Sequence, residues 1–536
     1  MLHKPFELPP PQAFNMPERY TEWRPFQDLA ILEIVDTDKR FITQVCPTGF
    51  GKSLTYVAAA TLQRGRGIIL TSTKGLQSQL IFDFKSMGAV DIRGRNAYPC
   101  LLLNDGSRCD TGPCNAGIRC KLRDSGCSYF DKVKEALKAP LVISNYAYWM
   151  TSNAYGDGLG KFNFMVCDEA HDTPDTVSSF LTVKLSRTDP LIKPILPSNN
   201  EIYQMTMPMW KAWAWDRGKG VGVEVDALVD YIKGGGGDQN DRWKLSRLRS
   251  LLQDLETLAK ADEDDWVLDV DKFSATFCPI WPKAYCEKYL FQDIEKVLLT
   301  SASVRAKTME YLGIAGEELI MSEYPHMFPV DRRLLIHIPT IRLNFRTTPE
   351  EMRVWQRRVD QIIRPRLDRK GIMHTGSYIR RDLILNNSKF KSSMITHQRA
   401  DTERRVLEFK DSMPPSTLVS PSVTTGFDFP YDECRYQIIG KLCYPDTRNK
   451  ITAARAKDDR DYAPYIAMQQ LVQACGRGCR AADDLCENFI IDDNIGWFME
   501  RYSSFAPDWF NEAFVAKGAI PPPATLYKGE YHDDNM

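Results

Sequence analysis

A glycine loop between a predicted strand and a predicted helix has the residue types of a phosphate-binding site. It runs Thr-Gly-Phe-Gly-Lys-Ser over residues 48–53. Glycines let successive backbone N–H groups close around phosphate oxygens at the start of a helix. Lys52 would neutralise the β- and γ-phosphates of a nucleotide, and the Ser53 hydroxyl would complete a Mg²⁺ shell. The full eight-residue pattern has glycine where this chain has Cys46, so a tight surface turn is the alternative interpretation.

A pair of acidic residues lies downstream, directly after an apolar run that predicts another strand. Asp168 and Glu169 follow the run Phe164–Cys167. An aspartate at the carboxyl end of a strand can hold Mg²⁺, and the adjacent glutamate can orient or deprotonate an attacking water. Such a pair can also occur by chance at an exposed helix start. Its place after a buried strand and downstream of a phosphate loop favours a site that binds Mg²⁺ and hydrolyses ATP.

Cysteines gather in one part of the chain, because five of the 14 fall between Cys100 and Cys127. No signal peptide precedes them, so we expect a reducing cytosol, where clustered thiols bind metal more often than they form disulfides. Thiolates at short, irregular spacing can converge on one metal centre. An iron–sulfur cluster, a Zn²⁺ ion and free thiols are the three alternatives.

The elements that must position these groups alternate between strands and helices. Short apolar runs that predict strands occur in two series, separated by helical patterns such as 54–62 and 76–84. This alternation is typical of parallel sheets with helices on both faces, so the predicted fold class is α/β with two lobes. The two series of predicted strands are 41–45, 67–71, 141–144, 164–167 and 296–300, and 371–374, 417–420, 437–440 and 489–492.

Composition narrows the class of protein. A chain of 536 residues is too long for one core and predicts about three domains. Its 43% hydrophobic and 26% charged residues are ordinary for a globular protein, and its net charge of -1 leaves any nucleic-acid surface to local clusters of Lys and Arg. No apolar run approaches the roughly 20 residues of a membrane span, so no membrane partner is expected.

The phosphate loop and the acidic pair together resemble those of the superfamily-two helicases that carry a DEAH box, here Asp168 to His171. Further segments resemble the other motifs of these helicases and follow in the family's order along the chain. They are Arg24 with Gln27, 71–73 with Gln77, 299–303, 374–378, 424–429 and 473–480.

The resemblance implies two RecA-like lobes that bind Mg·ATP between them. It implies catalytic roles for Lys52, Asp168, Glu169, Arg477 and Arg480, with Arg480 as the arginine finger, Arg477 assisting, and Ser53 and Asp168 as Mg²⁺ ligands. Arginine suits this role because its planar fork meets phosphate oxygens bidentately. The implied nucleotide-binding residues are Arg24, Gln27, Thr48, Gly49, Gly51, Lys52, Ser53, Asp168, Asp428 and Gln473.

The cysteines make the chain similar to the XPD/DinG branch of these helicases, which carries a [4Fe–4S] cluster at this place in the first lobe. In that branch the first ligand follows a Gly-Arg-x-Asn-Tyr-like stretch and a late ligand precedes an aromatic pair, which here implies Cys100 and Cys127. Cys114 and Cys120 are the expected remaining ligands. Cys109 can replace one of them, although it lies only a short turn from Cys100. Zn²⁺ held by four thiolates is the alternative to the cluster.

The same branch also inserts a helical arch after the DEAH box. In this chain six leucines between Leu245 and Leu258 share one helical face and are expected to pack in a core. The basic residues around them (Arg242, Lys244, Arg247 and Arg249) either form a solvated face or line a channel for a strand. Trp210, Trp213 and Trp215 are expected to pack within the arch rather than to stack on bases.

The resemblance and the composition together predict the domain boundaries. The first RecA-like lobe comprises 24–90, 131–174 and 266–303, and the second comprises 304–520. The iron–sulfur insert is 91–130 and the arch is 175–265. Residues 1–23 are expected to form an N-terminal tail and 521–536 a disordered one.

The expected function is ATP-dependent unwinding of DNA, with single-stranded and forked DNA as partners and the iron–sulfur domain as a wedge. The resemblance implies travel from 5′ to 3′, which no residue indicates by itself. A translocase or remodeller that separates no strands, and a regulatory nucleic-acid-binding ATPase, are the alternatives. A cytoplasmic protein of a bacterium or a phage-infected host, with replication, recombination or repair proteins as partners, fits this expectation.

Overall fold

The first lobe is built on a seven-stranded parallel sheet in the order β10-β1-β9-β5-β2-β4-β3. The computed structural model describes residues 8–103, 105–421 and 427–526. The strands are the buried apolar runs of the sequence, and all five residues of β2 are buried. Their bounds are β1 Phe41–Val45, β2 Gly67–Thr71, β3 Ala89–Asp91, β4 Leu141–Asn145, β5 Phe164–Asp168, β9 Lys296–Ser301 and β10 Leu319–Glu323.

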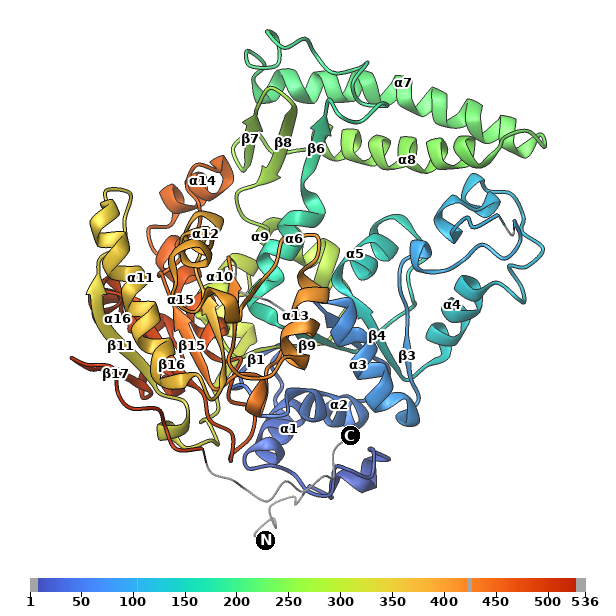
Figure 1. Ribbon diagram of the computed structural model, residues 1–536. Helices are drawn as coiled ribbons and strands as arrows, with labels where there is room; N and C mark the ends of the chain where they lie inside the picture. Colours follow the sequence, from blue (N-terminus) through green and yellow to red (C-terminus); the bar gives the residue numbers. More distant parts are fainter. Residues whose placement is uncertain (1–7, 104, 422–426, 527–536) are drawn as a thin grey trace.

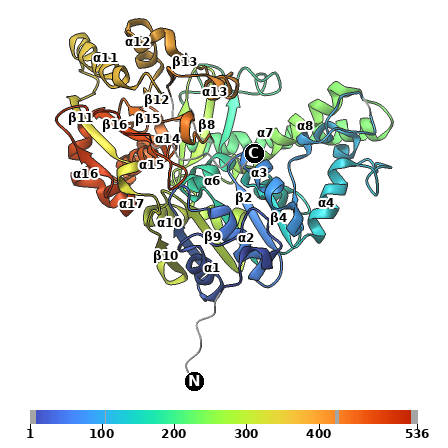
Figure 2. The same cartoon turned by 60° about the horizontal axis from the view of Figure 1, so that its bottom comes forward.

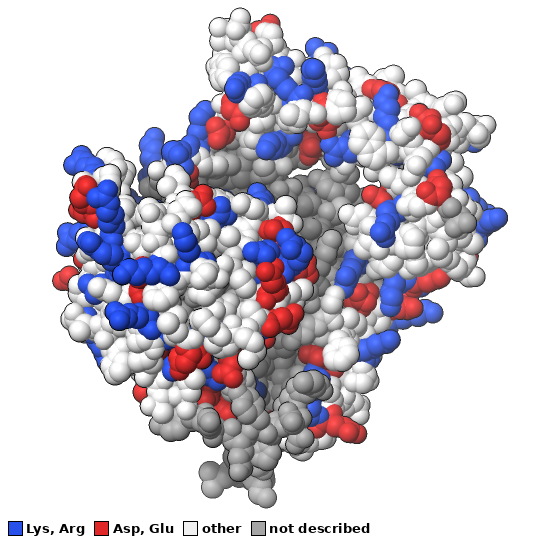
Figure 3. Space-filling view, viewed as in Figure 1, with Lys and Arg blue, Asp and Glu red and all other residues white. Residues whose placement is uncertain are grey.

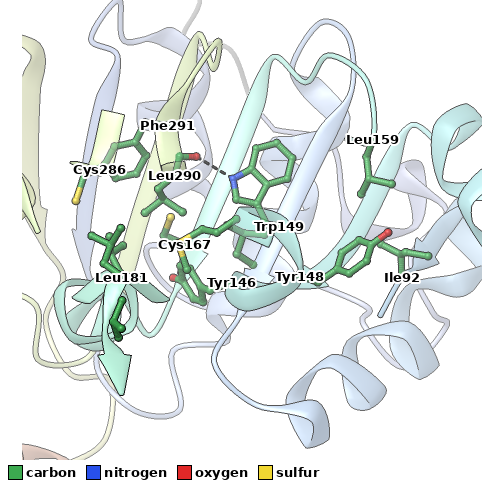
Figure 4. Packing of buried hydrophobic residues seen from close by; sticks show 14 of the residues in the cluster. Ile92, Tyr146, Tyr148, Trp149, Leu159, Cys167, Leu181, Cys286, Leu290 and Phe291 are labelled. Atoms are coloured by element: carbon green, nitrogen blue, oxygen red, sulfur yellow. Dashed lines mark hydrogen bonds between the residues drawn. The ribbon is translucent and has the colours of Figure 1, made fainter. Parts of the chain in front are cut away.

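Helices cover both faces of this sheet, as the alternation predicts (Figure 1). On one face, aromatic and aliphatic side chains of α5 pack against the strands, and the Trp149 indole N–H donates to the carbonyl of Leu290 at 2.9 Å (Figure 4). The helices of this lobe are α1 Gln27–Asp36, α2 Lys52–Leu62, α3 Lys74–Phe84, α4 Ser128–Lys138, α5 Tyr146–Tyr155, α6 Thr173–Leu181, α9 Lys283–Cys286 and α10 Ala306–Leu312.

A second seven-stranded parallel sheet, in the order β13-β14-β12-β15-β16-β11-β17, forms the second lobe. Its strands are β11 Leu335–Ile341, β12 Lys370–His374, β13 Met394–Thr396, β14 Ser416–Ser420, β15 Tyr436–Ile439, β16 Glu487–Asp492 and β17 Phe514–Ala516. Its helices are α11 Pro349–Ile363, α12 Tyr378–Asn387, α13 Thr402–Asp411, α14 Lys450–Asp458, α15 Tyr462–Cys475, α16 Asn494–Tyr502 and α17 Asp508–Asn511. The predicted α/β fold with two parallel-sheet lobes is confirmed.

Two expected boundaries differ from the structure. β10 pairs with β1 in parallel, so residues 319–323 complete the first sheet, although the expected boundary at 304 assigned them to the second lobe. The chain leaves β9, forms α10 and returns beside β1, which is an ordinary strand–helix–strand crossover. Residues 266–279 do not join the first sheet, because β7 and β8 pair antiparallel with each other.

A two-helix arch projects beyond the lobes (Figure 1). We use the name arch for α7 (Met207–Lys233), α8 (Gln239–Ala259) and the antiparallel sheet β6-β8-β7 at their base. The three strands are β6 Val183–Ser186, β7 Trp266–Val270 and β8 Ser274–Pro279. A capping box of Asp238 and Asp241 begins α8. Five of the six leucines predicted to pack are buried against α7, and Leu252 is partly buried. Trp210 is fully buried and Trp213 partly, as expected, whereas Trp215 is 62% exposed.

The insert, residues 91–130, lies beneath the far end of the arch helices (Figure 1). Arg242 of α8 pairs with Asp105 at 3.1 Å, and Arg249 donates to the Asn115 amide oxygen at 3.3 Å. Lys244 and Arg247 pair with acidic residues of the arch region, Glu224 and Asp189. Basic and acidic side chains alternate over the arch in Figure 3. Arg242 and Arg249 therefore join the arch to the insert, whereas Lys244 and Arg247 form ion pairs within the arch region.

In the part of the chain that the structure describes, no helix is both long and apolar enough to cross a bilayer.

Candidate nucleotide site and cysteine cluster

The phosphate loop lies at the carboxyl edge of the first sheet, where α/β proteins bind ligands. Gly49 and Gly51 adopt φ of 79° and 82°, a left-handed conformation that favours glycine. A Cβ on Gly51 would lie 2.5 Å from the Gln27 amide nitrogen and would displace that side chain. Lys52 and Ser53 then begin α2. The loop thus presents the N-terminus of a helix, as a phosphate site requires.

Asp168 and Glu169 lie at the same edge of the sheet as the loop, because the parallel strands β1 and β5 are separated only by β9. Asp168 is the last residue of β5, and Glu169 adopts φ of 51°. The Glu169 carboxylate pairs with Lys52 Nζ at 3.0 Å. The Tyr56 hydroxyl donates to Asp168 Oδ2 at 3.2 Å and lies 3.3 Å from Ser53 Oγ. Sequence reasoning missed Tyr56, although its place one helical turn after Lys52 puts it on the same face of α2.

The two acidic residues of this site have different affinities for protons. Burial raises the pKa of Asp168 to about 6, against the opposing charge of Lys52. Burial acts in the same direction on Glu169, but Lys52 and His171 outweigh it and hold the pKa of Glu169 well below its usual value. Glu169 is therefore ionised at neutral pH, whereas Asp168 loses its proton only as the pH rises through about 6.

This difference predicts how Mg²⁺ binding depends on pH. Mg²⁺ needs an ionised carboxylate, so the Mg²⁺ concentration for half-maximal ATP hydrolysis should rise as the pH falls below about 6, where Asp168 takes up a proton. Mg²⁺ titrations of ATPase activity about one pH unit on either side of that value test this. The Asp172→Asn variant should keep the same dependence, because Asp172 lies outside the expected Mg²⁺ shell. An unchanged midpoint in the wild type would contradict the assignment of Asp168.

The second lobe brings two arginines to the same cleft. Arg477 donates to the carbonyl of Phe427 at 2.8 Å, and Arg480 forms an ion pair with Asp428. The Nε atoms of both arginines are buried and have no hydrogen-bond partner among the described residues. Burial lowers the pKa of Arg480 to about 10, and the charge of Glu169 on the opposite lobe counteracts this shift. The cleft thus holds guanidinium groups that remain charged and have spare donors.

Direct contacts join the two walls of the cleft. Gln473 of α15 donates to the Ser303 hydroxyl at 2.9 Å. On the first lobe, Ser301 Oγ lies 2.7 Å from His171 Nδ1 and 3.3 Å from the Glu169 carboxylate. A short path of polar contacts therefore leads from the acidic pair toward the second lobe.

Three other motif residues have structural contacts. Gln27 is 1% exposed, and its amide donates to the carbonyl of Phe50 at 2.8 Å, while Arg24 donates to that of Gly49 at 2.5 Å. Both side chains thus brace the phosphate loop. Gln77, which belongs to one of the segments that resemble helicase motifs, is fully buried and donates to the carbonyl of Ile92 at 3.0 Å, so its side chain has a structural contact and is not free to bind a ligand. Residues 424–426 of the motif at 424–429 lie outside the described residues.

The five cysteines of the insert lie close to one another. The Cys109 thiol lies against that of Cys127 and near those of Cys100 and Cys114, and its pKa is raised to about 12 by burial and by these neighbours. A Cβ on Gly112 would lie 3.2 Å from Cys100 Sγ and 3.7 Å from Cys114 Sγ, so glycine keeps space open beside both thiols. Cys120 lies near Cys114. No three His, Cys, Asp or Glu side chains in the described ranges are already arranged as a metal shell.

Comparisons with known proteins match both lobes. The DEAD/DEAH box helicase domain matches residues 24–195, and the helicase C-terminal domain matches residues 373–513. An XPD helicase structure has a TM-score of 0.63 at 14% identity, over 92% of this chain and 99% of its own. Xpd4 of S. tokodaii has a TM-score of 0.57 at 13% identity, over 92% of this chain and 100% of its own. No curated protein sequence matches significantly.

Proposed function

Because the chain belongs to the DEAD/DEAH-box helicases, which hydrolyse ATP, we propose that it is a DNA helicase that moves along single-stranded DNA from 5′ to 3′ and unwinds duplexes. The observation that carries this proposal is the meeting of both lobes around Glu169. Lys52 pairs with Glu169 from the first lobe, and the charge of Glu169 acts on Arg477 and Arg480 of the second. A nucleotide bound between these groups would tie the two lobes together through its γ-phosphate.

Each group has a role that its contacts support. Lys52, at the start of α2, would hold the β- and γ-phosphates. Ser53 and Asp168 would hold Mg²⁺, which neutralises phosphate charge. Glu169 remains ionised at neutral pH and can accept a proton from the attacking water. Arg480 would leave Asp428 and place its charge on the transferred phosphoryl group, with Arg477 beside it. Loss of the γ-phosphate would then release the two lobes from each other.

The choice of DNA and of direction rests on the fold, which resembles that of XPD helicases. ATP hydrolysis measured with single-stranded DNA, single-stranded RNA and blunt duplex tests the substrate. We expect the largest stimulation by single-stranded DNA, and we expect duplexes with a 5′ tail to be unwound in preference to those with a 3′ tail. Stimulation by RNA alone, or a preference for the 3′ tail, would contradict this part of the proposal.

We propose further that the insert holds a [4Fe–4S] cluster through Cys100, Cys109, Cys114 and Cys127. The contact between Cys109 and Cys127 favours Cys109 as a ligand in place of Cys120, which is predicted from the sequence. The insert has few large apolar residues, so metal binding would supply much of the free energy that orders it. The insert lies under the arch, where an ordered domain could act as a wedge between strands.

The ligand set can be tested one cysteine at a time. Serine in place of Cys100, Cys109, Cys114 or Cys127 should remove iron and the absorbance at about 400 nm from anaerobically purified protein. These variants should still bind ATP, because both lobes have their own cores, but they should lose duplex separation. Cys120→Ser is the matched control and should keep its iron. A full iron content in Cys109→Ser would contradict this ligand set. Colourless wild-type protein that contains zinc would show that the site binds Zn²⁺ and no iron–sulfur cluster.

A further inference from the structure

One helix of the second lobe, α14, packs against the base of the arch. Figures 1 and 2 both place it beside the three-stranded sheet from which the arch helices project. Lys450, its first residue, lies 3.8 Å from Asp269 of β7. The arch is part of the first lobe by sequence, so α14 forms a contact between lobes that is separate from the nucleotide cleft.

Arg455 lies at the centre of this contact. Its side chain is buried, although its neighbours in the helix, Ala454 and Ala456, are only partly buried. The guanidinium donates to the Asp175 carboxylate at 2.6 Å, to the Ser178 hydroxyl at 2.8 Å and to the carbonyl of Ile280 at 2.6 Å. All three partners belong to the first lobe or to the chain leaving the arch. One second-lobe side chain thus bonds both to α6 and to the residue that follows β8.

Aromatic packing surrounds the guanidinium. Arg455 lies over the ring of Trp281 at 5.2 Å, and Trp281 stacks on Tyr311 with 4.3 Å between ring centroids and 10° between planes. The Trp281 indole N–H donates to Asp458, the last residue of α14, at 2.7 Å. These contacts bury the Arg455 side chain, whereas the Asp175 carboxylate on its other side is 63% exposed. Removing its partners would leave the buried guanidinium unsatisfied, which is costly.

The contact is close in sequence to the groups expected to sense the nucleotide. α14 is followed by α15, which carries Gln473 and ends at Cys475, just before Arg477. On the other lobe, α6 begins four residues after Glu169. A movement of the arginines relative to the acidic pair would therefore be passed through α15 and α14 to the base of the arch.

We propose that Arg455 is a positioning residue that makes the arch follow the second lobe during the ATP cycle. This inference rests on the proposed function, because it assigns a mechanical role to the arch in strand separation. The three partners of Arg455 belong to the segments that enter and leave the arch, so they would transmit the motion at the base of α7 and α8. Arg455 itself touches neither nucleotide nor the reacting atoms.

Distance measurements test the motion directly. Fluorophores on non-natural residues at Trp215 of the arch and Phe82 of α3, which are 62% and 81% exposed, would report the distance from the arch to the first lobe. A second pair, Trp215 with Ile379 of α12, would report the distance to the second lobe. We expect a nucleotide analogue to change the first distance and leave the second constant. Arg455→Ala should reverse this pattern. If the distance between Trp215 and Phe82 in the wild type did not change on addition of the nucleotide analogue, the inference would be overturned.

Coupling of hydrolysis to unwinding gives an independent test. Base pairs separated per ATP hydrolysed should fall roughly three- to thirtyfold in Arg455→Ala, the range that substitutions along coupling contacts produce. Asp175→Asn should also lower the number of base pairs separated per ATP. Asp175 is the more exposed partner of Arg455, so this substitution disturbs folding least. Arg455→Lys should recover only part of the unwinding per ATP that Arg455→Ala loses, since an ammonium group lacks the planar set of donors of a guanidinium.

The control is Lys457→Ala, which removes a positive charge from the exposed side of the same helix and should keep the wild-type ratio of base pairs separated to ATP hydrolysed. If Arg455→Ala and Asp175→Asn both kept the wild-type ratio, the inference would fail while the proposed helicase remained. Wild-type protein that separates no duplex would instead overturn the proposed function itself.

Discussion

Lys52→Ala is expected to abolish ATP turnover, with a loss of about a thousandfold or more. Lys52 pairs with Glu169 of the acidic pair at 3.0 Å. Its removal would take the positive charge from the phosphate site and leave Glu169 without that partner, so the pKa of Glu169 should rise. Lys161→Ala removes an exposed lysine of the same lobe that also pairs with a glutamate, and it should have no effect.

Glu169→Gln tests the other side of the same pair. Glutamine can still accept a hydrogen bond from Lys52 but cannot take a proton from water, so ATP should bind while hydrolysis stops. Nucleotide affinity and single-turnover hydrolysis separate the two steps. Near-native DNA-stimulated turnover in either Lys52→Ala or Glu169→Gln would show that the cleft is wrongly assigned.

Arg480→Ala should lower the turnover number by about a thousandfold while nucleotide affinity falls much less. Arg480 belongs to the second lobe and forms an ion pair with Asp428. Its charge should therefore matter most when the cleft closes on the transition state, where a fixed guanidinium replaces water as the partner of phosphate oxygens. Turnover at saturating ATP and the affinity for a fluorescent nucleotide, measured on the same protein, give the two quantities.

The matched control for this variant is Arg448→Ala. Arg448 is also an arginine of the second lobe paired with an aspartate, but its side chain is 90% exposed. It should leave turnover unchanged. A loss below about threefold in Arg480→Ala would remove Arg480 from the transition state, since comparable groups contribute far more.

The two sheets could be predicted from sequence because each of their central strands is buried on both faces. Such strands form continuous apolar runs, of which 67–71 is an example. The short strands at the sheet edges were missed. β3 and β13 have three residues each and are partly exposed, and β10 is only half-buried, so none has the apolar run of a central strand.

The candidate site was predictable where its residues are close in sequence, as in the phosphate loop and the acidic pair. Contacts between distant parts of the chain were not. Nothing near Arg455 in the sequence indicates that its partners lie at 175, 178 and 280. Gln77 was assigned from its motif alone, and only the structure shows that its amide satisfies the backbone of neighbouring strands. The cysteine contacts likewise depend on the path of a loop with little regular structure.

The measurement that tests the whole account most directly is strand displacement from a forked DNA duplex with a 5′ tail. Wild-type protein with Mg·ATP should release the displaced strand. It should release none with a non-hydrolysable analogue, and Glu169→Gln should release none with ATP. Protein that hydrolyses ATP on single-stranded DNA yet displaces no strand from a 5′- or 3′-tailed duplex would contradict the account and leave a translocase that separates no strands.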